Sequence, residues 1–148
     1  PIERMKKMST RTVIDGDGLI LGRMASIIAK RLLAGETIDI VNAENIVVSG
    51  KKKMVINTEK EFLEVGGHGK GPIHYRQPHR IVRRTIRGML PHRKAHGRDA
   101  YSRLKVHIGV PDEFEGADME KMEKYHSSKL NRRFVTVGEI AENIGWKK

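Results

Sequence analysis

At 148 residues, the chain is long enough to fold as one domain with a buried core. It contains no cysteine, which excludes disulfides, thiolate metal sites and a cysteine nucleophile. Its 29 Lys and Arg residues outnumber its 18 Asp and Glu residues, so the formal net charge is +11. A protein this basic repels itself when free, and we expect a polyanionic partner, with nucleic acid as the first candidate and an acidic membrane face as the second.

Strand and helix patterns alternate in the first half of the chain. β-branched runs predict strands at residues 12–15, 37–41 and 46–49. Apolar residues at helical spacing predict a helix over residues 21–34, which Gly35 closes. Thr58 and Glu61 form a capping-box pair, which predicts a second helix from about residue 58 to residue 65. This alternation favours an α/β domain with a mostly parallel sheet.

The second half of the chain is less regular. Four glycines predict a loop over residues 66–71, a helix is expected at residues 79–90, and residues 91–103 are expected to be irregular. The remaining expected elements are strands at 104–110 and 134–137 and a helix at 139–144. Residues 112–123 carry six acidic residues, and we expect this acidic segment to cover a basic surface of the same domain or of a neighbouring protein. The chain is therefore read as one domain, with a core at about 12–110 and a C-terminal extension at 111–148.

The excess positive charge is confined to residues 68–105, which carry 11 Lys and Arg residues against Asp99 alone. Eight of the 11 are arginine, which makes bidentate phosphate contacts and stacks on bases. On the expected helix at 79–90, the apolar and the basic residues fall on opposite halves when successive residues are placed about 100° apart. One half can pack on the domain while the other presents four arginines: Arg80, Arg83, Arg84 and Arg87.

The pattern of this helix also separates the classes of polyanion. A membrane-surface helix needs bulky Trp, Phe or Leu side chains on its apolar face, whereas this one carries mainly Ile, Val, Thr and Met. The N-terminal residues 1–10 lack the apolar core of a secretory signal, and no apolar run approaches the roughly 20 residues that span a bilayer, so a cytoplasmic protein is expected. The sequence has no helix-turn-helix, zinc-finger or basic-zipper pattern, and its 5% aromatic content argues against a base-stacking sheet. Recognition of the backbone and shape of a folded RNA remains.

Two glycine-containing turns suggest nucleotide binding only weakly. Gly16-x-Gly18-x-x-x-Gly22 is one residue too long for a dinucleotide fingerprint, and Asp17 would repel a pyrophosphate, so a tight strand-to-helix turn is favoured. The run at residues 49–53 lacks the upstream glycine and the following Ser or Thr of a phosphate loop, and it is interpreted as a basic turn that touches RNA. A nucleotide-using α/β enzyme built on the first turn is the competing hypothesis.

The histidines raise the question of a metal site. His92 and His96 have the i, i+4 spacing that holds zinc on a helix, but Arg93 and Lys94 lie between them and no carboxylate or cysteine ligand is near in sequence. RNA contacts by these histidines are favoured, and no metal or other cofactor is expected.

Several motifs resemble the universal large-subunit ribosomal protein L13 family, in its archaeal form. They are Val13-Ile14-Asp15, Leu21-Gly22-Arg23-Met24-Ala25-Ser26, Val41-Asn42-Ala43-Glu44, Ser49-Gly50-Lys51, Arg87-Gly88-Met89-Leu90-Pro91, Gly97-Arg98 and Leu104-Lys105-Val106. The resemblance covers about residues 12–110, and the Arg87–Pro91 motif behind an arginine-rich helix is a specific marker. The tail containing Val135-Thr136-Val137-Gly138-Glu139-Ile140 resembles the archaeal branch.

The resemblance implies a three-layer α/β domain that is a structural constituent of the large ribosomal subunit, not an enzyme. It implies binding of large-subunit rRNA, support of subunit assembly and translation, contacts with neighbouring ribosomal proteins, and no small-molecule substrate. A regulatory role off the ribosome would use the same arginines. The rRNA contacts that it implies are Lys51, Lys52, Arg80, Arg83, Arg84, Arg87, Gly88, His92, Arg93, Lys94, His96 and Arg98. Arg76 and Arg103, from the same basic stretch, complete the predicted site.

Overall fold

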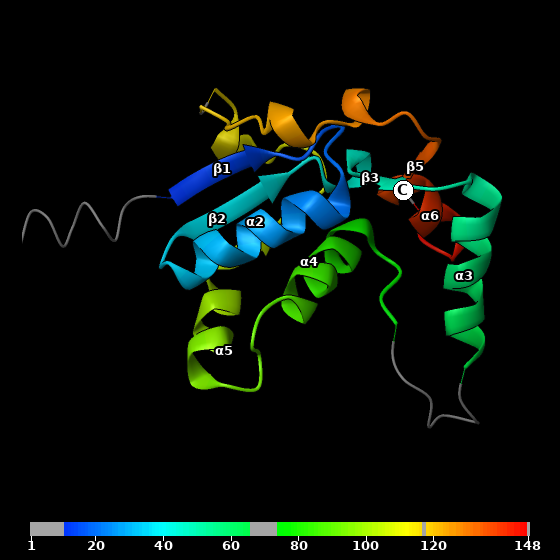
Figure 1. The fold of residues 1–148 in the computed structure, drawn as a ribbon. Coiled ribbons are helices and arrows are strands. Elements are labelled where there is room, and N and C mark those ends of the chain that lie inside the picture. The colour runs from blue at the N-terminus through cyan, green and yellow to red at the C-terminus, as the bar shows by residue number, and fades with distance from the viewer. Residues whose placement is uncertain (1–10, 66–73, 117, 148) are drawn as a thin grey trace, which may run out of the picture.

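The computed structural model describes residues 11–65, 74–116 and 118–147, and the predicted loop at 66–71 lies outside them. The central sheet has three parallel strands in the order β1-β2-β4 (Figure 1). They are β1 (Arg11–Asp15), β2 (Thr37–Val41) and β4 (Leu104–Val106). The predicted strands at 12–15 and 37–41 and the α/β fold class are confirmed. The strand expected at 104–110 ends at Val106. The chain then turns through Gly109 (φ +66°), whose carbonyl accepts a hydrogen bond of 2.9 Å from the Asn42 N–H.

The strand predicted at 46–49 does not join this sheet. β3 (Val47–Ser49) pairs antiparallel with β5 (Phe134–Thr136) to form a separate two-stranded sheet. α6 (Val137–Asn143) follows β5 directly, and the Thr136 hydroxyl caps it by accepting the Glu139 backbone N–H at 3.2 Å.

Helices cover one face of the parallel sheet (Figure 1). These are α2 (Leu21–Leu33), α4 (Pro78–Gly88) and α5 (Ala95–Ser102). Ile14, Ile38 and Ile40 point from the strands into this layer, where they meet the buried faces of the three helices in one cluster. α2 matches its prediction within one residue, and Gly35 follows it at φ +103°, a conformation that favours glycine.

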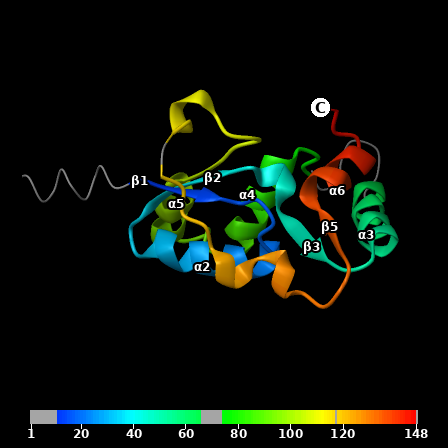
Figure 2. The same cartoon turned by 90° about the horizontal axis from the view of Figure 1, so that it is seen from above.

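The opposite face and the free edge of the sheet are covered by the acidic segment. Phe114 and Met119 pack against Val13 and Val41 on that face. The backbone of Glu120 extends the sheet beyond β1. Its N–H donates to the Val13 carbonyl at 2.8 Å, and its carbonyl accepts the Asp15 N–H at 3.0 Å. Seen from above, the chain coloured yellow to orange crosses over β1 (Figure 2). The acidic segment therefore covers the chain's own sheet, where it packs on apolar Val13 and Val41 instead of the expected basic surface, and it forms the third layer. A short 3-10 turn at Asp112–Phe114 begins it, and turns at Glu123–Tyr125 and Ser127–Lys129 follow it.

Two sequence predictions of local structure were wrong. The helix expected from residue 58 is α3 (Lys52–Glu64), and Thr58 is not its cap, because its hydroxyl donates to the Met54 carbonyl inside the helix at 2.9 Å. Residues 91–103 are not irregular, since α5 occupies most of them. Gly, His and Asp in α5 are weak helix formers, and the helix depends on packing that propensity does not register.

A carboxylate is buried beneath the acidic segment. Asp39 of β2 is fully buried and accepts hydrogen bonds from Nε and Nη2 of Arg11, while Nε2 of His107 lies 3.1 Å from its Oδ1. The hydrogen bond to Asp39 raises the pKa of Arg11. Phe114 closes this cluster, because its ring lies 5.5 Å from both the His107 ring and the Arg11 guanidinium carbon.

We expect Arg11→Met to lower the free energy of unfolding by about 1–3 kcal/mol, because the buried Asp39 would lose its main charged partner. Adding Asp39→Leu should restore much of this loss, since two apolar side chains leave no buried charge unpaired. Urea unfolding of the two variants and the parent protein measures both effects. An Arg11→Met variant as stable as the parent protein would show that Arg11 does not stabilise the buried carboxylate of Asp39.

Candidate nucleic-acid interface

α4 presents its arginines because its other half is part of the core. Gln77 is extended and Pro78 occupies the first turn, which starts the helix. Val82 and Ile86 are fully buried and pack in the cluster that includes α2 and β4. The predicted helix is confirmed, with its C-terminal end at Gly88 instead of residue 90. Of the predicted apolar half, Val82, Ile86 and Leu90 are buried, whereas Met89 is exposed.

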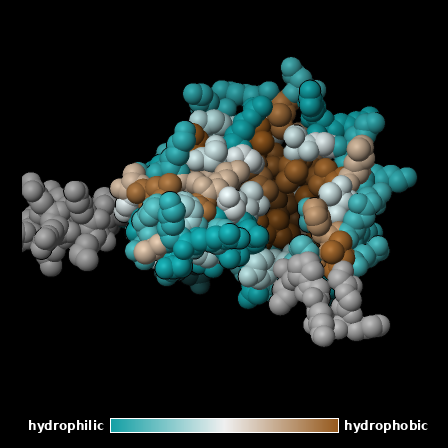
Figure 3. Space-filling model, turned by 60° about the horizontal axis from the view of Figure 1, so that its bottom comes forward, coloured by the Kyte–Doolittle hydropathy of each residue, from teal (hydrophilic) through white to brown (hydrophobic). Residues whose placement is uncertain are grey.

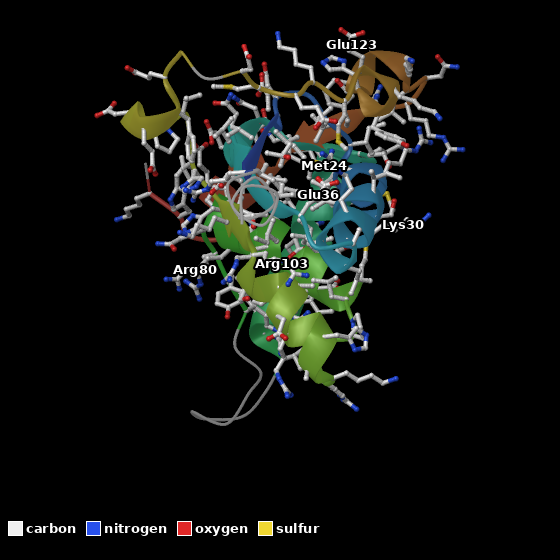
Figure 4. The ribbon with its side chains drawn as sticks, turned by 90° about the vertical axis from the view of Figure 1, so that its left-hand side faces the viewer. Met24, Lys30, Glu36, Arg80, Arg103 and Glu123 are labelled. Atoms are coloured by element: carbon white, nitrogen blue, oxygen red, sulfur yellow. The ribbon has the colours of Figure 1, made fainter. Side chains whose placement is uncertain are left out.

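The four arginines of α4 have no carboxylate partner within the described residues. Arg80 and Arg84 are exposed, and Arg83 and Arg87 are half-buried. Figure 4 places Arg80 at the edge of the domain and Lys30 of α2 on the other side of this view. Since the like charges are held on one helix without neutralisation, the surface favours an anionic ligand.

An open groove of about 530 Å³ lies beside these arginines. It is lined by Tyr75, Arg83, Arg87, His92, Arg98 and Tyr101, which come from the segment before α4, from α4 itself, from the turn that follows it and from α5. The guanidinium carbon of Arg83 lies 4.1 Å from the centroid of the Tyr101 ring, a cation–π contact that fixes the arginine. None of these lining residues is acidic. On the underside of the molecule, the surface is hydrophilic over α5 and the neighbouring part of α4, and an apolar area lies towards α3 (Figure 3).

Sequence reasoning missed the two tyrosines of this groove. Tyr75 and Tyr101 are 26 positions apart, and the low overall aromatic content was taken as an argument against base stacking. The available signal was their position near the two ends of the arginine-rich stretch. In the folded protein both tyrosines line the same groove.

The other predicted residues are divided among several places. Arg76, Arg93, Lys94 and His96 are exposed on the segments that flank α4 and on α5. His92 lines the groove but lies outside α5, whereas His96 is inside it, so the two do not share a helical face. Lys51 and Lys52 lie at the start of α3, which packs on β5 and α6 and contributes no side chain to the groove.

Arg103 differs from the rest of the set. Its Nη2 donates to the carbonyl of Leu32 at the C-terminal end of α2, a position where a positive charge is favourable. Figure 4 shows Arg103 near the centre of the domain in that view. At least one donor of this guanidinium is therefore engaged inside the protein.

The glycine turn that suggested a dinucleotide site is closed by protein atoms. Added to Gly16, a Cβ would lie 2.9 Å from the Val41 carbonyl oxygen, and at Gly18 (φ +74°) it would lie 2.4 Å from Nε2 of His126. The backbone of Tyr125 accepts the Ile20 N–H, and Ser127 donates to the Gly18 carbonyl. The turn therefore anchors the segment that follows the acidic residues.

His79 lies on α4 next to the arginines, and its Nδ1 is buried without a hydrogen-bond partner among the described atoms. Burial lowers the pKa of His79, and the positive charges of Arg80, His107 and Arg83 lower it further. The neutral imidazole is thus the favoured form in the folded protein.

Gly88 and Gly97 differ in the space that the protein leaves for a side chain at each position. A Cβ on Gly97 would lie 2.0 Å from the carbonyl oxygen of Pro91, so glycine is required where α5 packs on the turn before it. A Cβ on Gly88 would meet only Nη1 of Arg84, at an ordinary contact distance of 3.8 Å. Nothing within the described protein requires glycine at residue 88, which leaves an exposed backbone beside the arginines.

The fold and the arginine-lined groove define a basic α/β protein suited to a polyanionic ligand. The model of the family described as ribosomal protein L13 matches residues 9–113. Relatives named large ribosomal subunit protein uL13 are similar over most of their length. The relative from Archaeoglobus fulgidus is 48% identical over 92% of this chain and 88% of its own. Those from Methanococcoides burtonii and Methanocaldococcus jannaschii are each 43% identical over 92% of this chain, and 99% and 98% of their own.

The chain belongs to the ribosomal protein L13 family. The family and its archaeal form, predicted from the sequence motifs, are confirmed. The protein is therefore a structural, non-enzymatic component of the cytoplasmic ribosome, and the hypothesis of a nucleotide-using enzyme was wrong. Within the described parts of the chain, no helix is long and apolar enough to span a membrane.

We expect Gly88→Ala to leave the free energy of unfolding unchanged or to raise it by about 0.5–1 kcal/mol, because alanine is the better helix former and meets open space. Gly97→Ala should lower it by about 1–3 kcal/mol through the clash with the Pro91 carbonyl. Thermal unfolding of the two variants side by side tests this contrast. Equal losses of stability in both variants would contradict the prediction.

His79 should titrate in the free folded protein with a midpoint below the ordinary histidine value of about 6.5. As the pH falls below that value, the unfolded chain takes up this proton before the folded protein does, so the free energy of unfolding should decrease. Above the ordinary histidine value, His79 is neutral in both the folded and the unfolded protein, and it no longer changes the free energy of unfolding with pH. NMR titration of the His79 ring gives the midpoint directly, and a value at or above 6.5 would contradict the proposed burial effect.

Proposed function

We propose that this protein is a structural constituent of the large ribosomal subunit and binds large-subunit rRNA through α4, the turn after it and α5. The names of the uL13 relatives support the assignment to the large subunit. The observation that carries the RNA-binding role is the set of four arginines on α4 that no described carboxylate neutralises.

This surface suits the backbone of a folded RNA. Guanidinium groups pair with phosphates in a bidentate manner, and phosphates between the arginines of α4 would remove the repulsion among them. Exposed basic side chains continue the surface beyond the helix, at Arg76, Arg93, Lys94 and His96. The bare backbone at Gly88 would allow close approach of an RNA strand to the end of α4.

Lys51 and Lys52 would form a second contact, separate from the groove. They begin α3, whose first turn contains no acidic residue, and both side chains are exposed. Backbone N–H groups and positive side chains at a helix start attract a phosphate. Two separate contacts on one fold would hold two RNA segments in a fixed arrangement, which supports a role in assembling the subunit. Contacts with neighbouring ribosomal proteins follow from membership of the subunit.

The charge contribution can be tested by removing one exposed charge from each side of the domain. Arg80→Ala removes a charge of the proposed interface, and Lys30→Ala removes one from the opposite side of the view in Figure 4. Affinity for in vitro transcripts that tile the large-subunit rRNA should be measured at several salt concentrations. Arg80→Ala should weaken binding and reduce the slope of log affinity against log salt by about 1, because one phosphate contact is lost.

Lys30→Ala should leave both the affinity and the slope near those of the parent protein. Equal losses in the two variants would show that binding follows net charge and not the α4 surface. Binding of the parent protein without any salt dependence would reject a phosphate-based interface altogether.

A further inference from the structure

The aromatic rings at the groove are placed for a task that phosphate binding does not need. Tyr75 is 42% exposed, although it lies in a groove that is otherwise lined by arginines, a histidine and Tyr101. The guanidinium carbon of Arg80 lies 5.7 Å from the Tyr75 ring centroid, on the side of a smaller pocket that shares Tyr75, Arg83 and Tyr101 with the groove. A backbone-binding surface gains little from such a ring, whereas a base can stack on it.

We propose that the groove holds one unpaired nucleotide of the bound RNA, with its base stacked on Tyr75 and its phosphate held by Arg87 and Arg98. This inference rests on the proposed rRNA-binding function and names the part of the RNA that this groove takes. A paired base keeps its faces covered by its neighbours in the helix, so a base that stacks on protein must be one that has left the helical stack.

The size and charge of the groove fit a nucleotide. Its volume of about 530 Å³ lies within the range of small-molecule sites. Arg87, Arg98 and His92 line the groove but not the smaller pocket, and they offer donors to a phosphate. No lining residue of the groove is a carboxylate. The Arg98 guanidinium is steadied by donation from Nη1 to the Arg93 carbonyl at 3.2 Å, which leaves its other donors for the ligand.

Arg83 has a different part from Arg87 and Arg98. Its guanidinium carbon lies over the Tyr101 ring, 4.1 Å from the centroid, and Arg83 also lines the groove. Arginine planes stack on bases as aromatic rings do. The base would therefore meet the ring of Tyr75 and the plane of Arg83, while Tyr101 acts as a positioning residue for Arg83.

The test uses the full-length protein and the rRNA transcript that binds it most tightly. Tyr75→Leu removes the ring and keeps an apolar side chain, Tyr75→Phe keeps the ring, and Phe134→Leu is the control. Phe134 is also exposed, at 47%, but lies on β5 and does not line the groove. Tyr75→Leu should weaken binding by about 5- to 100-fold, with an unchanged salt slope because no phosphate contact is lost. Tyr75→Phe and Phe134→Leu should bind as the parent protein does.

Ultraviolet crosslinking of the parent complex supplies a second readout, because stacked aromatic residues crosslink to the base that they touch. Mass spectrometry should find Tyr75 joined to a nucleotide that chemical probing shows to be unpaired in the free RNA. Parent-like affinity of Tyr75→Leu, combined with weaker binding of Arg87→Ala and Arg98→Ala, would overturn the nucleotide pocket and leave the rRNA-binding function standing. Parent-like affinity of all three variants and of Arg80→Ala would reject the proposed function itself.

Discussion

The packing of Val82 and Ile86 of α4 into the core is the contact on which the rest of the candidate site depends. Both side chains are fully buried, and burial of such residues contributes roughly 1.5–3 kcal/mol each. This gain has to offset the repulsion among four arginines that share the opposite half of a helix of 11 residues. The helix is held in the free protein by its apolar half, and its charged half is thereby preorganised for a ligand, which lowers the entropic cost of binding.

The acidic segment shows how the same chain keeps its own carboxylates away from the arginine surface. It crosses the opposite face of the sheet, where its Phe114 and Met119 pack on β1 and β2 and the backbone of Glu120 extends the sheet edge. Glu120 also pairs with Arg31 near the end of α2, 3.0 Å from its Nη1. Backbone hydrogen bonds and apolar contacts hold this segment on the sheet, away from α4. Phe114 and Met119 therefore hold the acidic segment across the parallel sheet from α4, and Glu120 lies at the sheet edge, where it reaches Arg31 of α2.

Much of this arrangement could be predicted from local patterns, and the failures have physical causes. β1, β2, α2 and α4 have clear periodicity and were placed within two residues. α5 was missed because it depends on contacts between separate segments, with Ala100 packed in the core cluster and Gly97 close against the Pro91 carbonyl. The start of α3 was misplaced because a capping-box pattern also occurs inside helices. The fold class, family and charged helix could be inferred, whereas the groove was missed because Tyr75 and Tyr101 come to line it only after the chain folds.

The arginines differ in availability, and only the structure separates them. Arg11 is bound to a buried carboxylate, Arg103 donates to the end of α2, and Arg83 is stacked on a tyrosine. Each of these guanidiniums has part of its bonding capacity satisfied within the protein, so its replacement would disturb the fold or the groove as well as the charge. Arg84 is exposed without an ion-pair partner among the described residues, so its replacement should affect the ligand alone. Arg80 is equally exposed and unpaired, but its guanidinium carbon lies 5.7 Å from the Tyr75 ring centroid. The number of basic residues at 68–105 therefore overstates the number of guanidinium groups that are free to contact RNA, because Arg83 and Arg103 already contact neutral groups of the protein.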